Sequence, residues 1–347
     1  MRAFNYYNLK YYHWDSEILG LVSQIHEYKG RQELYLKQKP AVLDKLVEIA
    51  KIRSTEASNE IEGIVTTDSR LRDLYQDKTI PRNRDEEEIL GYRDVLNTIH
   101  GSFEFIPIQS TYILQLHRDL YQYSAKSFGG RYKATQNIIT KTGSDGRQSV
   151  IFTPLDSYET PIAIDNICES YNQTLEDDVI DPLVLIPIFI LDFLCVHPFN
   201  DGNGRMSRLL TALLLYREGY VVGKYISIES KIEKTKESYY EVLEQSNHKW
   251  HEEENNPFPF IKYILGIILS AYRDFEERVD LMDDKLPSKE LVIQAINQNL
   301  GKFTKSEIMD LVPSISRASI ENALKQLVED NEIERHGKGR ATFYTRK

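Results

Sequence analysis

Helical periodicity is the feature that most limits what this chain can fold into. Apolar residues recur at three-and-four spacing, and each periodic stretch is bounded by Pro, Gly, Asn or Asp. The spacing predicts helices over residues 15–35, 41–62, 85–100, 109–123, 161–176, 182–196, 205–218, 231–247 and 259–282. With 347 residues and 41% apolar content, the chain can bury sizeable cores. The sequence therefore predicts a mainly α fold.

One segment interrupts the helical pattern. Residues 130–154 read GRYKATQNIITKTGSDGRQSVIFTP, a stretch rich in Thr, Ile and Val that alternates and centres on Gly-Ser-Asp-Gly. Alternation on both sides of a glycine-rich turn is typical of two antiparallel strands. We therefore expect a β-hairpin here.

The pattern changes again after residues 282–287, where we place a domain boundary. Thr304 and Glu307 have the spacing of a capping box at the start of a helix. The sequence beyond the boundary predicts helices over 288–299, 304–311 and 316–330, then strands over 332–335 and 341–345. Three helices and a hairpin within residues 288–347 are typical of a winged helix-turn-helix.

Two kinds of partner remain open for this C-terminal module. Residues 335–347 contain five basic residues and no acidic one, which favours contact with DNA through the hairpin and the helix at 316–330. Residues 288–347 as a whole hold ten Lys and Arg against eight Asp and Glu, and the net charge of the chain is −10. Dedicated nucleic-acid binders present a clearly basic surface. Contact with another protein is therefore the alternative.

Cysteine usage and the apolar runs indicate the compartment. Cys168 and Cys195 both lie beside apolar residues, which favours buried thiols over a disulfide. The first residues have neither the apolar core nor the small-residue cleavage site of a signal peptide. The apolar runs at 182–196 and 260–272 fall short of the ~20 residues that a membrane span needs. We expect a soluble, cytoplasmic protein.

The stretch with the most chemistry is HPFNDGNGRMSR, residues 197–208, between two apolar helices. Its glycines let backbone N–H groups converge at a helix N-terminus, an arrangement that binds phosphate. Asp201 is a hard oxygen ligand that could hold Mg²⁺ against such a phosphate. Arg205 and Arg208 lie one turn apart, so both guanidinium groups can meet phosphate oxygens. His197 can accept a proton near neutral pH. These groups fit phosphoryl or nucleotidyl transfer from a nucleotide.

Other catalytic and metal motifs are absent from the sequence. It contains no GxxxxGK[ST], no GxGxxG after a strand and no HExxH. His248 and His251 lack a third ligand nearby, so surface histidines are favoured over a zinc site. His117 lies on an amphipathic helix, where a structural role is expected.

The stretch at 197–208 resembles the signature of the Fic family, H-x-F-x-[DE]-G-N-G-R-x-x-R, at every specified position. GRYKATQN at 130–137 with IFTP at 151–154 looks like the flap hairpin of that family, and YYEVLEQSN at 239–247 looks like its nucleotide-base segment. The resemblance implies a Fic-type helical core over residues 91–282 with its flap at 130–154. It also implies an N-terminal helical domain over residues 1–90, before the winged helix.

The resemblance implies transfer of AMP from ATP to a protein hydroxyl of Tyr, Ser or Thr, with release of pyrophosphate. In that case His197 deprotonates the hydroxyl, Phe199 anchors the loop and Asp201 binds Mg²⁺. The remaining site residues would contact the nucleotide: Gly202, Asn203, Gly204, Arg205 and Arg208 its phosphates, and Tyr240 and Asn247 its adenosine. Tyr240 and Asn247 are seven residues apart, hence on one helix face. A core Tyr and a capping Asn are the alternative for that pair.

Many Fic proteins also carry an inhibitory helix with the pattern [ST]-x-x-x-E-[GN]. Ser58, Glu62 and Gly63 fit it within residues 54–64, before the catalytic motif. A Glu62 carboxylate facing Arg208 would occupy the fork that should receive the γ-phosphate. Gly63 suits a helix end, where positive φ is common. The alternative is an amphipathic helix that merely ends at Gly63.

Competing functions follow from the same residues. Relatives can remove AMP, or transfer another nucleotide or another part of the donor. A different class is a DNA-binding regulator in which the Fic core acts as a sensor. The resemblance also implies that a target protein binds along the flap by β-augmentation. Family members often form homodimers, but no interface can be predicted from this sequence.

Overall fold

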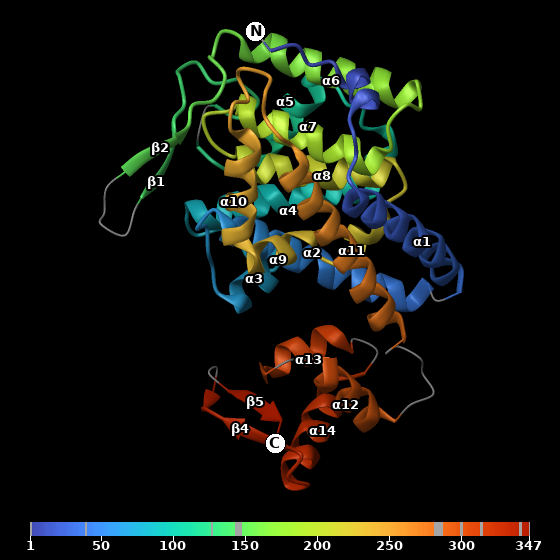
Figure 1. The fold of residues 1–347 in the computed structure, drawn as a ribbon. Helices are drawn as coiled ribbons and strands as arrows, with labels where there is room; N and C mark the ends of the chain where they lie inside the picture. The colour runs from blue at the N-terminus through green and yellow to red at the C-terminus, as the bar shows by residue number, and fades with distance from the viewer. Residues whose placement is uncertain are drawn as a thin grey trace.

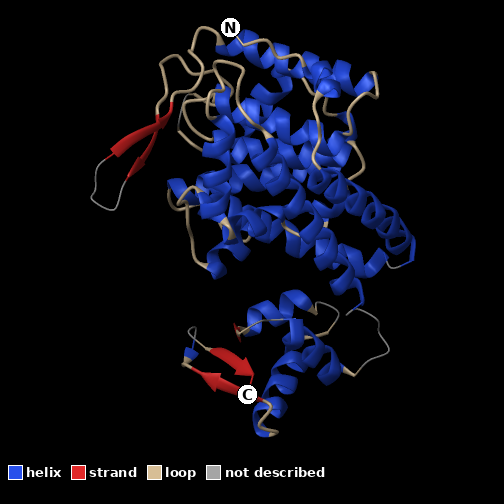
Figure 2. Ribbon diagram, in the orientation of Figure 1, coloured by secondary structure: helices blue, strands red, loops and turns tan. Residues whose placement is uncertain are grey.

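The computed structural model describes residues 2–38, 40–125, 128–142, 148–280, 287–298, 301–312, 315–339 and 342–346. A bundle of helices forms the larger part, and the C-terminal residues form a smaller unit beside it (Figure 1). Among the residues described, strand occurs in one projecting hairpin and in the C-terminal unit (Figure 2). The expected mainly α fold with a small sheet component is confirmed.

The N-terminal segment wraps one side of the bundle. It contains the 3₁₀ helix η1 (Tyr6–Tyr11) and the helices α1 (Ser16–Gln38), α2 (Pro40–Ile61) and α3 (Asp68–Tyr75). α1 packs against the later helix α11, and α2 packs against α4 and α9. The sequence pattern did not predict α3. The N-cap of this short helix is Thr67, whose side chain accepts a hydrogen bond from the backbone N–H of Arg70.

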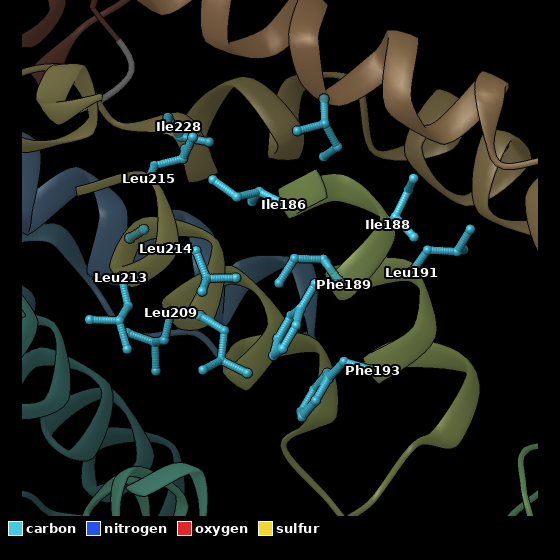
Figure 3. Packing of buried hydrophobic residues seen from close by; sticks show 14 of the residues in the cluster. Ile186, Ile188, Phe189, Leu191, Phe193, Leu209, Leu213, Leu214, Leu215 and Ile228 are labelled. Atoms are coloured by element: carbon cyan, nitrogen blue, oxygen red, sulfur yellow. The ribbon is translucent and has the colours of Figure 1, made fainter. Parts of the chain in front are cut away.

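The centre of the bundle is built from long helices. These are α4 (Arg84–Ser102), α5 (Ser110–Leu120), α6 (Thr160–Glu176), α7 (Pro182–Val196) and α8 (Asn203–Arg217), with the 3₁₀ turn η2 (Phe103–Phe105) after α4. Nearly every side chain of α7 is buried, so this helix is apolar on all sides. Figure 3 shows Phe189 and Phe193 of α7 among leucines of α8. The loop between α7 and α8 is therefore held by two fully packed helices.

The predicted helix over 231–247 is wrong as a single element. The structure has α9 (Ile228–Lys234) and α10 (Lys236–Asn247), separated at Thr235, whose φ is −120° and ψ is 30°. The 3₁₀ turn η3 (Val221–Lys224) precedes them, and α11 (Phe258–Asp280) follows. Each part keeps the apolar spacing of a helix, so the pattern suggested one continuous element. The two helices differ in their packing: α9 packs on α2, whereas α10 packs on α11.

The hairpin contains β1 (Ile139–Thr142) and β2 (Gln148–Phe152). They pair antiparallel, Thr140 opposite Val150, with a register shift between Ile139 and Thr140. The strands project from the bundle (Figure 1). The expected Gly-Ser-Asp-Gly turn lies outside the described residues.

The C-terminal unit follows the expected element order with one added strand. It contains α12 (Ser288–Gln298), β3 (Lys302–Phe303), α13 (Lys305–Leu311), α14 (Arg317–Glu329), β4 (Ile333–His336) and β5 (Phe343–Arg346). The sheet order is β3-β5-β4, and a separate apolar cluster forms its core. The capping box of Thr304 and Glu307 is present. The expected boundary at 282–287 falls almost wholly outside the described residues.

Polar contacts connect this unit to the bundle at α2 and α3. Arg53 of α2 donates to Asp310 of α13 through Nε at 3.0 Å and through Nη2 at 2.5 Å. Arg72 of α3 donates to the Ser306 hydroxyl at 3.4 Å.

The cysteines and the apolar helices bear on two further expectations. Cys168 and Cys195 are free, buried thiols, as expected. Within the described ranges, no helix is both long enough and apolar enough to span a bilayer.

Candidate active site

The site starts where α7 ends. The C-cap residue of α7 is His197, which adopts the left-handed conformation with φ 51° and ψ 62°. Its N–H still donates to the Phe193 carbonyl at 2.9 Å. A residue other than glycine in this conformation costs about 1–2 kcal/mol, so the surroundings must hold it there. The turn places the imidazole beside the loop that leads into α8.

The imidazole of His197 is held neutral. Burial lowers its pKa to about 4, and the nearby Lys133 ammonium acts in the same direction. The Leu194 carbonyl and the carboxylates of Glu62 and Asp201 oppose this shift. Because Nδ1 is buried, Nε2 is the nitrogen left to face a ligand. At neutral pH, His197 is therefore a proton acceptor.

Glycines shape the start of α8. Gly202 is the N-cap with φ 82°, and a Cβ there would lie 2.9 Å from the Tyr121 hydroxyl. At Gly204 a Cβ would lie 2.2 Å from Oε1 of Glu62. The Glu62 carboxylate therefore rests against the bare backbone of the first turn, where the helix dipole and free N–H groups attract an anion.

Asn203 closes the loop on itself. Its Oδ1 accepts from the Phe199 N–H at 2.9 Å, and its Nδ2 donates to the Phe199 carbonyl at 2.8 Å. The Phe199 ring stacks on the imidazole of His117, with centroids 3.6 Å apart. Asn203 is 2% exposed, so its amide fixes the loop conformation. Its side chain is thus engaged within the protein.

Arg205 is buried in a paired-charge network. Its Nη2 donates to Oε2 of Glu88 at 2.6 Å and to the Tyr121 hydroxyl at 2.7 Å. The other Glu88 oxygen accepts from Arg84 at 2.7 Å, and Arg84 also lies 3.5 Å from Asp201. Arg205 is 1% exposed, and its Nε and Nη1 have no hydrogen-bond partner within the described part of the chain.

Arg208 meets the end of α2. Its Nε donates to the Ser58 hydroxyl, and its Nη2 donates to the Ser58 carbonyl and to Oε1 of Glu62, each at 2.8 Å. Burial disfavours the charge of Arg208, but the facing Glu62 carboxylate holds its pKa above the ordinary value. Of the expected trio, Ser58 and Glu62 therefore bind Arg208 of α8 directly.

The end of α2 is a well-formed helix cap. The Gly63 N–H donates to Glu60 at 2.9 Å, and the Ile64 N–H donates to Asn59 at 3.0 Å. Gly63 has φ 77°, so these bonds form a Schellman motif in which Glu62 is the C-cap residue. The position of the Glu62 carboxylate is thus set by the helix end.

The two residues expected to hold adenosine both lie on α10. Tyr240 is 42% exposed, and its pKa is raised by burial and by the nearby Glu62 carboxylate. Asn247 is 8% exposed at the last position of the helix. Tyr240 therefore borders the end of α2, whereas Asn247 lies two turns further along.

Comparison with known proteins assigns the family. A sequence model described as Fic/DOC family matches residues 107–215. A Fido domain-containing protein of Dictyostelium discoideum is 30% identical over 115 residues, which are 30% of this chain and 80% of that relative. The chain belongs to the Fic/DOC family. The match covers the flap, the loop after α7 and most of α8.

Longer Fic relatives are named as enzymes. Protein adenylyltransferase Fic of Nematostella vectensis is 25% identical over 219 residues, 60% of this chain and 44% of the relative. Protein adenylyltransferase fic-1 of Caenorhabditis elegans is 28% identical over 186 residues, 52% and 32% of the two lengths. The chain thus spans less than half the length of these curated relatives.

Solved Fic structures share the fold. A Fic family protein from Desulfovibrio desulfuricans superposes with a TM-score of 0.64 at 24% identity and covers 97% of both chains. A Fic domain-containing signaling protein from Bacteroides thetaiotaomicron gives 0.60 at 22% identity, over 76% of this chain and 97% of that one. At these identities the likeness concerns the fold.

His117 has the structural role expected of it: its side chain is fully buried, Gly130 N–H donates to its Nδ1 at 3.0 Å, and its Nε2 lies 3.1 Å from the Asp201 carbonyl. Two other residues around the loop were missed at the sequence level. Glu88 and Tyr121 come from α4 and the end of α5 to bind Arg205. No local spacing marks these residues, because each reaches the loop from a distant helix. A buried arginine needs an acidic partner, so burial of Arg205 would have predicted a carboxylate such as that of Glu88.

Proposed function

We propose that this chain transfers AMP from ATP to a hydroxyl of a protein, its own chain included, releasing pyrophosphate. The observation that carries the proposal is the neutral His197 imidazole at the end of α7, next to the anion-attracting first turn of α8. The names of the longer relatives, protein adenylyltransferases, point the same way.

The reaction can be written on the residues of this loop. The target hydroxyl oxygen attacks the α-phosphorus as its proton passes to Nε2 of His197. The bond between the α-phosphorus and the oxygen shared with the β-phosphate breaks, and pyrophosphate leaves. A positioned general base contributes roughly 10²–10⁴-fold to such a step. The left-handed turn at His197 supports this role, since it presents the imidazole to the loop.

The phosphates are assigned to the start of α8. The backbone N–H groups of Asn203 and Gly204 would bind them, while Gly202, whose N–H bonds to Asp201, shapes the turn and the Asn203 side chain holds the loop. Arg208 would bind the outer phosphates once its contacts with α2 are released. Arg205 would add Nε and Nη1, which are unpartnered within the described residues but buried, so phosphate oxygens must reach them through the loop. Tyr240 and Asn247 are assigned to the adenosine.

The residues present also fit a magnesium ion. Asp201 is 40% exposed at its side chain, with Oδ1 accepting from the Gly202 N–H at 2.7 Å. One carboxylate is enough, because Mg²⁺ in nucleotide sites keeps waters and takes its other ligands from phosphates. When bound there, the ion neutralises phosphate charge. No cluster of three or more His, Cys, Asp or Glu occurs among the described residues, which suits an ion held jointly with the substrate.

We further propose that the resting protein inhibits itself through α2. The carboxylate of Glu62 rests on Gly204 and pairs with Arg208, at the position proposed for an outer phosphate. Ser58 adds two more contacts to the same guanidinium. ATP entering this site would have its triphosphate displaced, so the α-phosphorus would not be presented in line with the hydroxyl.

The target protein is proposed to bind along the hairpin of β1 and β2. The hairpin projects from the bundle (Figure 1), and the segment that leads into it binds the catalytic loop through Asn137 and the Phe199 carbonyl. Its paired strands can extend by β-augmentation. Backbone pairing of this kind reads an extended segment rather than a particular side chain.

Labelled ATP tests the proposed reaction. The Glu62→Gly variant is incubated with ATP labelled at either the α- or the γ-phosphate, in a lysate of its own cell and alone. Label from the α-position on protein, with none from the γ-position, is the expected result. Label from the γ-position would indicate phosphoryl transfer. Release of free AMP from an already modified protein would indicate hydrolytic removal of AMP, with water as the attacking group. Protein without label in both arms would refute the proposed function.

A second role is proposed for the C-terminal unit. A cleft of about 980 Å³ between α3 and this unit is lined by Arg72, Lys305, Arg317 and Arg335, with Asp73 as its acidic member. This lining favours a polyanion such as DNA. Binding of a duplex that weakens with salt and is lost on deleting 288–347 is the expected result. Binding that survives the deletion would place DNA elsewhere on the chain.

A further inference from the structure

Lys133 occupies an unusual place next to the catalytic loop. It lies between α5 and β1, in the segment that leads into the hairpin, and it is 2% exposed. Its backbone N–H donates to the Pro198 carbonyl at 2.8 Å. Its Nζ donates to the Val196 carbonyl at 2.9 Å. One residue thus binds the carbonyl on each side of His197.

We propose that Lys133 is a positioning residue for His197, fixing the backbone on both sides of the imidazole and setting a positive charge beside it. The role of the imidazole itself rests on the proposed function. The contacts that define the role of Lys133 do not depend on it.

The backbone part of the argument follows from the conformation of His197. A left-handed residue that is not glycine is held only if its neighbours are restrained. The Val196 carbonyl is one of the last carbonyls of α7, which have no N–H partner within the helix, and Val196 is fully buried. A buried acceptor needs a donor, and a cation at a helix C-terminus is favourable. The Lys133 ammonium meets both needs.

The flap adds a second restraint in the same direction. Asn137 Nδ2 donates to the Phe199 carbonyl at 2.9 Å, two residues beyond His197. The segment from Lys133 to Asn137 therefore runs along the loop and binds it at successive carbonyls. The hairpin and the proposed base are joined by these contacts.

The charge of Lys133 has a distinct effect. After burial, it is the main influence that lowers the pKa of His197, while the Leu194 carbonyl, Glu62 and Asp201 raise it. Burial also lowers the pKa of Lys133, to about 8, so most of its ammonium groups keep their proton at pH 7. The charge of Lys133 thereby disfavours protonation of the imidazole.

Four variants separate the charge from the backbone contact. Lys133→Met removes both the charge and the side-chain donor. Lys133→Gln removes the charge but keeps a donor, and Lys133→Arg keeps both. Lys224→Met is the matched control: Lys224 is half-buried, its pKa is also lowered by burial, and it donates to a backbone carbonyl, that of His100, at 3.1 Å.

The first measurement is an NMR titration of the His197 imidazole in each variant, which needs no activity. The pKa of His197 is expected to rise in Lys133→Met and Lys133→Gln, and to stay unchanged in Lys133→Arg and Lys224→Met. An unchanged pKa of His197 in the two neutral variants would overturn the electrostatic part. If Lys133→Met does not fold, Lys133→Gln decides.

The second measurement uses AMP transfer in the Glu62→Gly background. In Lys133→Met, kcat is expected to fall about tenfold to a hundredfold because the imidazole loses its fixed position, and a positioned general base contributes roughly 10²–10⁴-fold in all. The KM for ATP should change little, and Lys133→Arg should restore most of kcat. An equal loss of kcat in every Lys133 variant, together with a lowered Tm, would show that Lys133 has only a structural role. If Glu62→Gly itself transfers no AMP, the proposed function fails, and the NMR titration still judges Lys133.

Discussion

Removing the carboxylate of Glu62 is the perturbation whose size the structure allows us to work out. Glu62→Gln keeps the shape of the side chain and removes the charge that faces Arg208. A hydrogen bond between charged groups contributes about 1.5–3 kcal/mol. The Glu62 side chain is 32% exposed, so solvent screening places the loss near the lower limit, about 1.5 kcal/mol.

The end of α2 is called closed when Glu62 is bound to Arg208 and open when it is not. A loss of that size shifts the equilibrium between these two states by about tenfold. If the closed form predominates at rest, the rate of AMP transfer rises by the same factor. The assay is initial-rate incorporation of α-labelled AMP at an ATP concentration well below KM, where binding competition is fully visible.

Glu60→Gln is the control for this experiment, because Glu60 is exposed on the same helix, two residues earlier. Its rate should equal that of the wild type. No rise in Glu62→Gln, or an equal rise in Glu60→Gln, would show that the contact with Arg208 does not restrain the reaction.

Four further outcomes are expected. Ser58→Ala should raise transfer about fivefold, since roughly 1 kcal/mol of hydrogen bonding to the guanidinium is lost; an unchanged rate would assign the restraint to the carboxylate alone. His197→Ala in the Glu62→Gly background should abolish transfer while calorimetry still detects ATP binding; retained transfer would exclude His197 as the base. Glu88→Gln should cost about 3–5 kcal/mol in urea unfolding, because it leaves a buried cation unpaired, whereas Glu87→Gln, at the preceding, half-buried position of α4, should cost much less. The free energy of unfolding should fall as pH drops from 6.5 towards 4, because burial lowers the pKa of His117 to about 4 and the unfolded chain binds the proton first. The slope for this group is about 1.4 kcal/mol per pH unit, and His117→Asn should remove this part of the pH dependence.

The parts of the fold that could be predicted are those encoded locally. The spacing of apolar residues located α7 to the residue, because the whole helix is buried between proline and histidine. The break between α9 and α10 could not be seen, since Thr235 is compatible with a helix and only the change of packing partner separates the two. α3 is too short for its periodicity to stand out.

The candidate site divides in the same way. Residues 197–208 are adjacent in sequence, so their chemistry follows from the order of the residues alone. The contact between Glu62 and Arg208 joins residues far apart in the chain and was expected only from the family resemblance. Glu88 and Lys133 contact this region from distant parts of the sequence, and no motif spacing relates them to residues 197–208. Their roles can therefore be recognised only in the folded structure.

The Schellman cap at Gly63 would make the proposed inhibition by Glu62 sensitive to temperature. Glu62 is held by the last turn of a helix, and helix ends fray more readily as temperature rises. The proportion of molecules with Arg208 exposed to nucleotide then follows the melting of one turn rather than the unfolding of a domain. Leakage through the site is therefore expected to grow with warming well below the temperature at which the bundle itself unfolds.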